Sequence, residues 1–417
     1  MEPVREKKKD LQPNLTSDVG IIGAGASGLT AAYFAGSRGL RVTVLEKKEQ
    51  AGKKLLITGN GRCNFSNERM DAGCYHASDC SFMERFLKRF STEDAVRFFE
   101  SLGMLSAERN GYLYPSSLQA ATVVFTLTEA CKRAGVSLLT NTEVSSVKKQ
   151  GDLFEVHTAE GQTFRFKKLV LACGSPSGVK DRNPFNAYDL LKGFGLEVKD
   201  PLPALVNLTG RCGFEKLWAG IRLNASVEFH GKRETGEVQF TDSGISGIPV
   251  FQLSGSVVEE LAMRRKAGEK EPEAAVILDL LPAYSEESLR KHLNRLPQAM
   301  SLEDGLRLFL PRKLVPVVLK KADLSFMKTA ESLSKEETGL LVKTLKAFVY
   351  PVTGHGSFLD SQVTRGGLRL TEITEDFEVR NVPGLHVTGE LLDIDGLCGG
   401  YNLHFAWGSG RIAGEHL

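Results

Sequence analysis

The stretch of sequence that decides the fold is DVGIIGAGASGLTAAYFAGSRGLRVTVLE, residues 18–46. Its apolar run at 18–22 predicts a β-strand, the glycine-rich turn GAGASG follows at 23–28, and the pattern from 29 to 38 predicts a helix. A second apolar run at 41–45 predicts another strand, which ends in an acid. Strand, glycine turn, helix, strand and acid in this order are typical of a Rossmann dinucleotide site.

The residue types in this stretch match the parts of a dinucleotide. Gly23 permits a tight turn, Gly25 lets a pyrophosphate approach the backbone, and Gly28 lets helix and strand pack closely. The start of the helix offers free N–H groups and a partial positive charge to the phosphates. The acid, Glu46, lies eighteen residues beyond Gly28, where it can accept hydrogen bonds from ribose, which favours FAD or NAD over NADP. The expected contacts are Gly23, Gly25, Ala26, Ser27, Gly28, Glu46 and Lys47.

Bulk composition limits the remaining possibilities. A length of 417 residues predicts two or three domains, and 53 basic against 51 acidic residues give a net charge of +2, which argues against a nucleic-acid partner. No apolar run approaches the roughly 20 residues that span a bilayer. Residues 1–17 lack the apolar segment of a signal peptide and predict a solvated tail. Seven scattered cysteines without a CxxC pair predict no metal site and suit a reducing cytoplasm.

A second segment with cofactor chemistry is KKLLITGNGRCNFSN, residues 53–67. It combines flexible glycines, a guanidinium and side-chain amides, which can wrap a diphosphate and a ribityl chain from a second side. A plain solvated loop is the alternative. The expected contacts are Lys54, Gly61, Arg62, Cys63 and Asn64.

The middle of the chain alternates predicted helices and strands. The aromatic stripe at 81–102 predicts one amphipathic helix that packs on the core, and 118–134 predicts another. A β meander follows from 137 to 166, and we expect Val144 on its cofactor side. The next segment predicts a buried strand that ends at Gly174, where a glycine allows the backbone to approach a neighbouring group closely. Beyond 193, short strands to 240 and a charged helical region at 257–334 predict an insertion. A second GxGxxG is lacking, so we expect no dedicated nicotinamide domain.

The C-terminal region provides a further set of candidates. LHVTGE at 385–390 predicts a strand that ends in an acid, and CGGYNL at 398–403 opens a helix rich in alanine and glycine. A strand-end acid can bind a ribityl hydroxyl, and the start of a helix can stabilise the negative charge of a reduced isoalloxazine. The expected contacts are Gly174, Gly389, Glu390, Asp395, Gly400, Asn402 and Leu403.

Several of these motifs together resemble the FAD-dependent flavoprotein family called aminoacetone-oxidase-like or bile-acid-reductase-like, within the glutathione-reductase structural group. The matching pieces are GAGASGL, VLEK, GKKLLITGNGRCNFSN, TRGG at 364–367 and GELLDIDGLCGGYNLHFAWGSGRIAG at 389–414. The resemblance implies an α/β fold, with a Rossmann-like three-layer FAD domain in two segments, 18–192 and 356–417. It also implies an inserted substrate domain at 193–355, which consists of a small β-barrel with a helical lobe near 255–334. The same resemblance adds Thr364 and Gly366 to the expected cofactor contacts.

The chain departs from the family pattern in two places. The family's FTHxGxSGP reads FTDSGISGI at 240–248, so Asp242 stands for the usual His and Ile248 for the usual Pro. The glycine-rich turn expected after Gly174 is replaced by DRNPF at 181–185. Both places belong to the expected substrate wall, so the substrate of a relative does not carry over directly.

Three functions follow from these observations. The first is an NAD(P)H-driven reductase of conjugated C=C bonds in 3-oxo steroid or bile-acid-like substrates, with NADH or NADPH bound transiently as electron donor. The second is a flavin oxidase of a small amine such as aminoacetone, which uses O2. The third, a tRNA-acting flavoprotein, is disfavoured by the near-neutral charge. Tyr114, His355 and Tyr401 are the candidate proton donors, and a structural role is the alternative for each. The sequence gives no oligomeric state.

Overall fold

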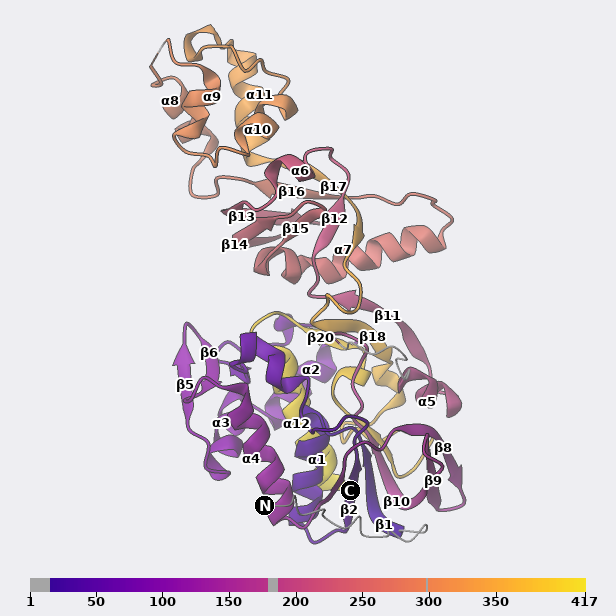
Figure 1. The fold of residues 1–417 in the computed structure, drawn as a ribbon. Helices are drawn as coiled ribbons and strands as arrows, with labels where there is room; N and C mark the ends of the chain where they lie inside the picture. Colours follow the sequence, from indigo (N-terminus) through magenta and orange to yellow (C-terminus); the bar gives the residue numbers. More distant parts are fainter. Residues whose placement is uncertain (1–15, 179–186, 298) are drawn as a thin grey trace, which may run out of the picture. The chain divides into compact units, whose positions relative to one another are not determined.

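The computed structural model describes residues 16–178, 187–297 and 299–417 (Figure 1). The replacement motif at 181–185 lies outside the described residues, as does nearly all of the predicted N-terminal tail. The chain divides into two compact units: unit 1 runs to Pro201 and resumes at Thr364, and unit 2 spans Leu202–Val363. The sequence-based domain boundaries at 192/193 and 355/356 stay a prediction.

Unit 1 contains most of the regular structure. Its strands are β1 Thr16–Ile22, β2 Val42–Leu45, β3 Ser66–Asn67, β4 Tyr75–Ala77, β5 Ser106–Arg109, β6 Tyr112–Pro115, β7 Ser137–Leu139, β8 Val144–Gln150, β9 Leu153–Thr158, β10 Thr163–Leu171, β11 Val198–Ala204, β18 Val363–Leu368, β19 Leu385–Val387 and β20 Ile394–Gly396. Its α-helices are α1 Ala26–Ser37, α2 Cys80–Arg89, α3 Thr92–Ser101, α4 Ala120–Arg133, α5 Ala187–Gly193 and α12 Tyr401–His416. Short 3-10 turns lie at Leu55–Gly61, Ala72–Cys74, Leu370–Glu372 and Gly389–Leu391. Strands β11 and β18, which pair with each other, carry the chain across the two unit boundaries.

The main sheet of unit 1 has a parallel centre, in the order β7-β2-β1-β10, with β19 beside the C-terminal part of β10. The strands are largely apolar where they are buried, as is typical of parallel strands; all four residues of β2, three of them apolar, are buried. In register, Ile22 lies opposite Leu45 on one side and Leu171 on the other, and Leu171 lies opposite Val387. Four strands therefore end together at one carboxyl edge, which is where α/β sheets bind their ligands.

Helix α12, at the C-terminus of the chain, lies directly against α1 (Figure 1). The contact depends on glycines. A Cβ added at Gly410 would lie 2.4 Å from the carbonyl oxygen of Ser27, and one at Gly414 would lie 2.7 Å from that of Ala31. Since neither position has room for a side chain, this spacing fixes the last segment of the sequence against the first helix.

The structure differs from the predicted elements at two places in unit 1. The predicted helix at 81–102 is two helices, α2 and α3, because Ser91 starts α3 with a capping box that it forms with Asp94. The first predicted meander strand also divides. β7 pairs in parallel with β2, and only β8 joins the antiparallel meander with β9 and the N-terminal part of β10.

Unit 2 contains a closed barrel in the order β12-β15-β14-β13-β16-β17. Its strands are β12 Leu208–Gly210, β13 Arg222–Phe229, β14 Lys232–Phe240, β15 Gly244–Ser246, β16 Ala274–Asp279 and β17 Phe348–His355. Its helices are α6 Glu215–Trp218, α7 Ile248–Lys266, α8 Glu286–Leu293, α9 Leu302–Arg307, α10 Val315–Lys321 and α11 Lys335–Lys346, with a 3-10 turn at Ala330–Ser332. The rings of Trp218, Phe240, Phe348 and Tyr350 pack together with centroids 5.0–6.0 Å from that of Trp218 and are fully buried. Side chains thus fill the unit's core, as in small barrels.

The glycines of the FTDSGISGI motif serve the barrel. A Cβ at Gly244 would lie 2.0 Å from the carbonyl oxygen of Leu208, and Gly247, with φ of 105°, precedes the first residue of α7. Asp242 and Ile248, the two departures from the family pattern, are both exposed in the described structure. Packing within unit 2 therefore explains the glycines, whereas Asp242 and Ile248 are exposed and take no part in that packing.

Within the range predicted as a helical lobe, the structure places a strand. Ala274–Asp279 is the barrel strand β16, and the helices continue beyond 334 to Lys346. Asp279 joins the barrel to the helical lobe. Its buried carboxylate pairs with Arg233 of β14 and, at 2.7 Å, with Lys346 of α11. The predicted fold class, an α/β unit with a parallel sheet and an inserted closed β-barrel, is confirmed. Among the described residues, no helix is both long and apolar enough to cross a membrane.

Candidate cofactor site

The first part of the candidate site is the turn between β1 and α1. Gly23, with φ of 103°, has no room for a Cβ, which would lie 2.5 Å from the carbonyl oxygen of Ala172, and a Cβ at Gly28 would lie 2.0 Å from the oxygen of Gly23. A Cβ at Gly25 would meet nothing within 4 Å. Helix α1 starts there with no side-chain cap and no acid in its first turn. Packing explains Gly23 and Gly28. Gly25 faces open space beside the first turn of α1, which contains Ala26 and Ser27 and has no side-chain cap, and this arrangement suits a pyrophosphate.

Glu46 lies at the end of β2, next to this turn. Its carboxylate accepts hydrogen bonds from the backbone N–H of Ala24 at 2.7 Å and of Lys48 at 2.9 Å. The backbone of Glu46 accepts from the N–H of Thr142, two residues before Val144 at the start of β8. The neighbouring Lys47 lies near Cys173, whose pKa burial raises to about 12. These contacts bring the ends of β2, β7 and β10 together around a carboxylate with lone pairs to spare for a ribose.

A second cluster surrounds Glu390 at the end of β19. The carboxylate of Glu390 pairs with Lys54 at 2.7 Å and accepts from the Ser175 hydroxyl at 2.8 Å and the Thr364 N–H at 3.0 Å. Thr364 also bonds Ser177 at 2.6 Å, and both hydroxyls are buried. The structure therefore unites three predicted residues, Lys54, Thr364 and Glu390, with two that sequence analysis missed. These two residues are Ser175 and Ser177. The sequence signal for them was the serine-rich stretch GSPS, which starts at Gly174 directly after a buried strand.

The loop at 58–67 forms the third part. Gly59, Asn60, Gly61 and Cys63 all have positive φ, between 53° and 78°. Glycine and Asn tolerate this conformation, but it is uncommon for Cys, and such backbone strain clusters at functional sites. This backbone buries Cys63 and brings Asn64 beside Gly400, where a Cβ would lie 2.8 Å from the Asn64 Oδ1. That oxygen is buried and has no partner in the described structure. Arg62, in contrast, is exposed.

Helix α12 starts next to this loop. Gly400 has φ of 94°, and the helix has no side-chain cap and no acid in its first turn. The Asn402 side chain closes the preceding loop, accepting from the Gly396 N–H and donating to the Gly396 carbonyl, both at 2.8 Å. Leu403, beside it, is half-buried against the core. The start of α12 is thus a rigid turn with N–H groups that no side chain caps.

Asp395 has a different environment from the other predicted contacts. It forms a bidentate ion pair with Arg365, at 3.1 Å and 3.0 Å, and both side chains are buried. Arg365 lies between Thr364 and Gly366, and a Cβ at Gly366 would lie 2.6 Å from the carbonyl oxygen of Asp200. The pair therefore ties β18 to β20, and both carboxylate oxygens face the guanidinium.

The three candidate proton donors lie in different surroundings. Tyr114, on β6, is half-buried, and burial raises its pKa. Burial also raises the pKa of Tyr401, the first residue of α12, whose hydroxyl meets Cys74. Both phenols are therefore protonated at neutral pH and able to donate. His355 belongs to unit 2, where it ends β17 and its Nδ1 lies 2.8 Å from the carbonyl oxygen of Gly356.

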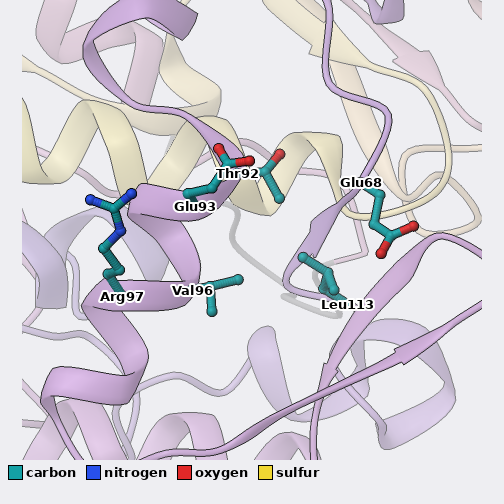
Figure 2. Close-up of a pocket in the computed structure, with 6 residues that line it drawn as sticks. All are labelled: Glu68, Thr92, Glu93, Val96, Arg97 and Leu113. Carbon is teal, nitrogen blue, oxygen red and sulfur yellow. The ribbon is translucent and has the colours of Figure 1, made fainter.

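A pocket of about 450 Å³ lies elsewhere in unit 1 and contains none of the predicted residues. Figure 2 shows its lining side chains, which come from α3, from β6 and from the segment after β3. They are Glu68, Thr92, Glu93, Val96, Arg97 and Leu113. Thr92 donates to the carbonyl oxygen of Asn67 at 2.8 Å, so one wall of this pocket anchors the end of the 58–67 loop.

Taken together, the residues of unit 1 fit an FAD molecule. Two helices, α1 and α12, start without side-chain caps, and Gly25 faces open space. The Asn64 Oδ1 and Thr388 Oγ1 atoms are buried without a partner in the described part of the chain. The α1 turn would hold the diphosphate, Glu46 the ribose, and Asn64 with the start of α12 the flavin. The described residues contain no group of His, Cys, Asp and Glu that could hold a metal ion.

This fold and site define a flavoprotein of the Rossmann type. The chain belongs to the HI0933-like family, because the family model described as HI0933-like protein Rossmann domain matches residues 17–416.

Several curated relatives cover almost the whole chain. The 3-dehydro-bile acid delta(4,6)-reductase of Clostridium scindens is 38% identical over 95% of this chain and 98% of the relative. The ribosomal RNA dihydrouridine synthase of Escherichia coli is 29% identical over 96% and 98%. Among solved structures, 3-ketosteroid delta1-dehydrogenase from Sterolibacterium denitrificans is similar in fold, with a TM-score of 0.51, 14% identity, and coverage of 96% and 99%. The chain is an FAD-dependent oxidoreductase, as predicted from the sequence.

The two strand-end acids give a testable prediction. Replacing Glu46 or Glu390 with alanine should weaken FAD binding, each by about 1–3 kcal/mol, because each change removes a carboxylate that orders the site. Titration of the apo-protein with FAD measures the effect. The control is Glu49→Ala, which removes an exposed acid that pairs with Lys53. FAD affinities equal to that of the control would contradict these assignments.

A second prediction concerns pH. Burial lowers the pKa of His386 and of His404 from 6.5 to about 4, so both are neutral in the folded chain near neutral pH. As the pH falls, these histidines take up protons in the unfolded chain at a higher pH than in the folded chain. The free energy of unfolding therefore keeps their full contribution above pH 6.5 and decreases as the pH drops from 6.5 towards 4. Each histidine lowers the free energy of unfolding by about 1.4 kcal/mol per pH unit as the pH falls through that window. Urea unfolding between pH 7 and 5 should show a shallower loss for His386→Leu than for wild type, and equal slopes would contradict the prediction.

Proposed function

We propose that this flavoenzyme reduces a C=C bond conjugated to a carbonyl group, in a 3-oxo steroid or bile-acid-like substrate, with NADH or NADPH as electron donor. The observation that carries the proposal is the 38% identity, over nearly the full length of both chains, to a relative whose name states this class of reaction. The Rossmann-type cofactor site described above supplies the matching chemistry.

In this proposal, FAD bound at this site would supply the hydride chemistry that links the nicotinamide to the β-carbon of the substrate. The chain positions the cofactor through Glu46, the Glu390 cluster and Asn64. The uncapped start of α12 would stabilise negative charge on the reduced ring. A phenol, Tyr114 or Tyr401, would deliver the proton that completes the addition of two hydrogens.

A second candidate substrate class is supported by the Escherichia coli relative. Uridine becomes dihydrouridine by the addition of two hydrogens to a C=C bond that is also conjugated to a carbonyl, so the same hydride transfer applies. A net charge of +2 weighs against an RNA substrate, since RNA binding depends on basic surface. The amine oxidase hypothesis finds no support among the reported relatives.

The test starts from the purified holo-protein under anaerobic conditions. NADH or NADPH should bleach the flavin, and a 3-oxo-Δ4,6 steroid should restore its colour and gain two hydrogens by mass spectrometry. The matched control is the saturated 3-oxo steroid, which should leave the flavin reduced. If only uridine-containing ribosomal RNA re-oxidises the flavin, the RNA candidate replaces the steroid. If an amine bleaches the flavin and air restores it, the reductase proposal is overturned.

A further inference from the structure

His404 lies in the first turns of α12, and neither the motif nor the comparisons give it a role. Its side chain is fully buried. Its Nδ1 lies 2.9 Å from the Ser66 hydroxyl, and its Nε2 lies 3.1 Å from the carbonyl oxygen of Phe90. The ring also packs beside the Phe86 and Phe90 rings, with centroids 6.4 and 5.0 Å away. Both ring nitrogens therefore have a fixed partner.

These partners determine the tautomer. A carbonyl oxygen only accepts, so Nε2 carries the hydrogen and donates to Phe90. Nδ1 is then the acceptor and receives the hydrogen of the Ser66 hydroxyl. The neutral imidazole thus donates in one direction and accepts in the other.

The link to Ser66 also sets the position of the helix start. The backbone N–H of His404 donates to the Gly400 carbonyl at 2.9 Å, which closes the first turn of α12. The carbonyl oxygen of Ser66 lies so near Gly400 that a Cβ there would approach it to 2.5 Å. His404 therefore connects, through its backbone and its side chain, the two segments that meet at Gly400.

Two further bonds join the same segments. The Asn67 side chain donates to the Gly399 carbonyl at 2.9 Å, and the Trp407 indole donates to the Phe65 carbonyl at 3.0 Å. These bonds flank the His404 link on both sides. Asn64, whose buried Oδ1 lacks a partner, lies two residues before Ser66.

We propose that His404 is a positioning residue for the cofactor, which holds Ser66 and so places Asn64 at the correct distance from the start of α12. The inference rests on FAD binding at these two segments and not on the identity of the substrate. A buried histidine would thereby set the spacing between the two segments that would contact the flavin.

The experiment compares FAD binding by five variants of the full chain, four single variants and the double variant His404→Phe/Ser66→Ala. His404→Phe keeps a ring but removes both bonds, Ser66→Ala removes the Ser66 bond from the other side, and His404→Gln retains one donor and one acceptor. The control is His386→Leu, which removes a buried histidine outside this link. Apo-protein is titrated with FAD, the flavin midpoint potential is measured, and thermal unfolding of the apo-proteins is followed in parallel.

We expect His404→Phe and Ser66→Ala each to raise the Kd for FAD by about tenfold or more, with a shifted midpoint potential. The double variant should be no worse than the poorer single variant, because both changes break the same bond. His404→Gln should recover part of the affinity, and His386→Leu should match wild type. If His404→Phe does not fold, the Kd of Ser66→Ala decides. An unchanged Kd for Ser66→Ala, or additive effects in the double variant, would overturn the proposal. No substrate enters this assay, so its outcome is independent of the proposed reaction.

Discussion

Replacing Arg365 with methionine is expected to lower the free energy of unfolding of unit 1 by about 3–5 kcal/mol. Arg365 and Asp395 form a bidentate pair at 3.1 Å and 3.0 Å, with side chains only 7% and 5% exposed. Removing the guanidinium leaves a carboxylate buried without its counter-charge, and desolvation then acts against the folded state. FAD should also be lost, because the pair ties β18 to β20 within the cofactor site.

The two tryptophans allow this effect to be measured in the correct unit. Trp407 is buried in unit 1 and Trp218 in unit 2, so a Trp218→Phe background leaves a fluorescence signal from unit 1 alone. Arg222→Met is the control, since Arg222 and its partner Glu237 are 65% and 56% exposed. Arg365→Met combined with Asp395→Leu should recover part of the loss. Equal unfolding midpoints for Arg365→Met and the control would contradict this role of the pair.

Replacing Gly25 with valine is expected to weaken FAD binding by more than about 100-fold, while apo-protein stability changes by only about 1 kcal/mol. The backbone of Gly25 is extended, with φ of −85° and ψ of −164°, which a β-branched residue adopts readily. Among the described residues, and apart from the chain neighbours of Gly25 and the backbone of α1, no atom lies within 4 Å of the added Cβ. The valine side chain therefore enters the space assigned to the pyrophosphate and nothing else. Titration with FAD and urea unfolding measure the two quantities separately.

Gly28→Val provides the contrast to this variant. At Gly28 the Cβ would lie 2.0 Å from the carbonyl oxygen of Gly23, a backbone atom that cannot move aside alone. Both FAD binding and stability should therefore be lost. The difference between these two glycines separates a residue that the cofactor requires from one that the fold requires.

The parts of this site that sequence could predict are those with local signals. The turn at 23–28 and Glu46 are set by a strand, a turn and an acid within thirty residues, and their physical roles depend on neighbours in the sequence. The parallel sheet then follows from apolar strand runs, and the carboxyl edge from their shared direction. The inserted barrel was expected from the family resemblance and from the short strands after 193.

The parts that sequence could not predict depend on distant pairing. Ser175 bonds Glu390, 215 positions later, and Ser66 bonds His404 across 338 positions. Nothing within a window of neighbouring residues marks such pairs. The break between α2 and α3 depends on one capping serine within a continuous aromatic stripe, and β16 is short and lies among charged segments, so periodicity alone missed both.

We propose that FAD lies with its diphosphate at the start of α1, and titration of apo Gly25→Val with FAD is the sharpest test of this placement. We expect an apo-protein that unfolds at nearly the wild-type urea concentration and retains no flavin through gel filtration. A variant that binds FAD with wild-type affinity would place the diphosphate elsewhere and overturn the proposal.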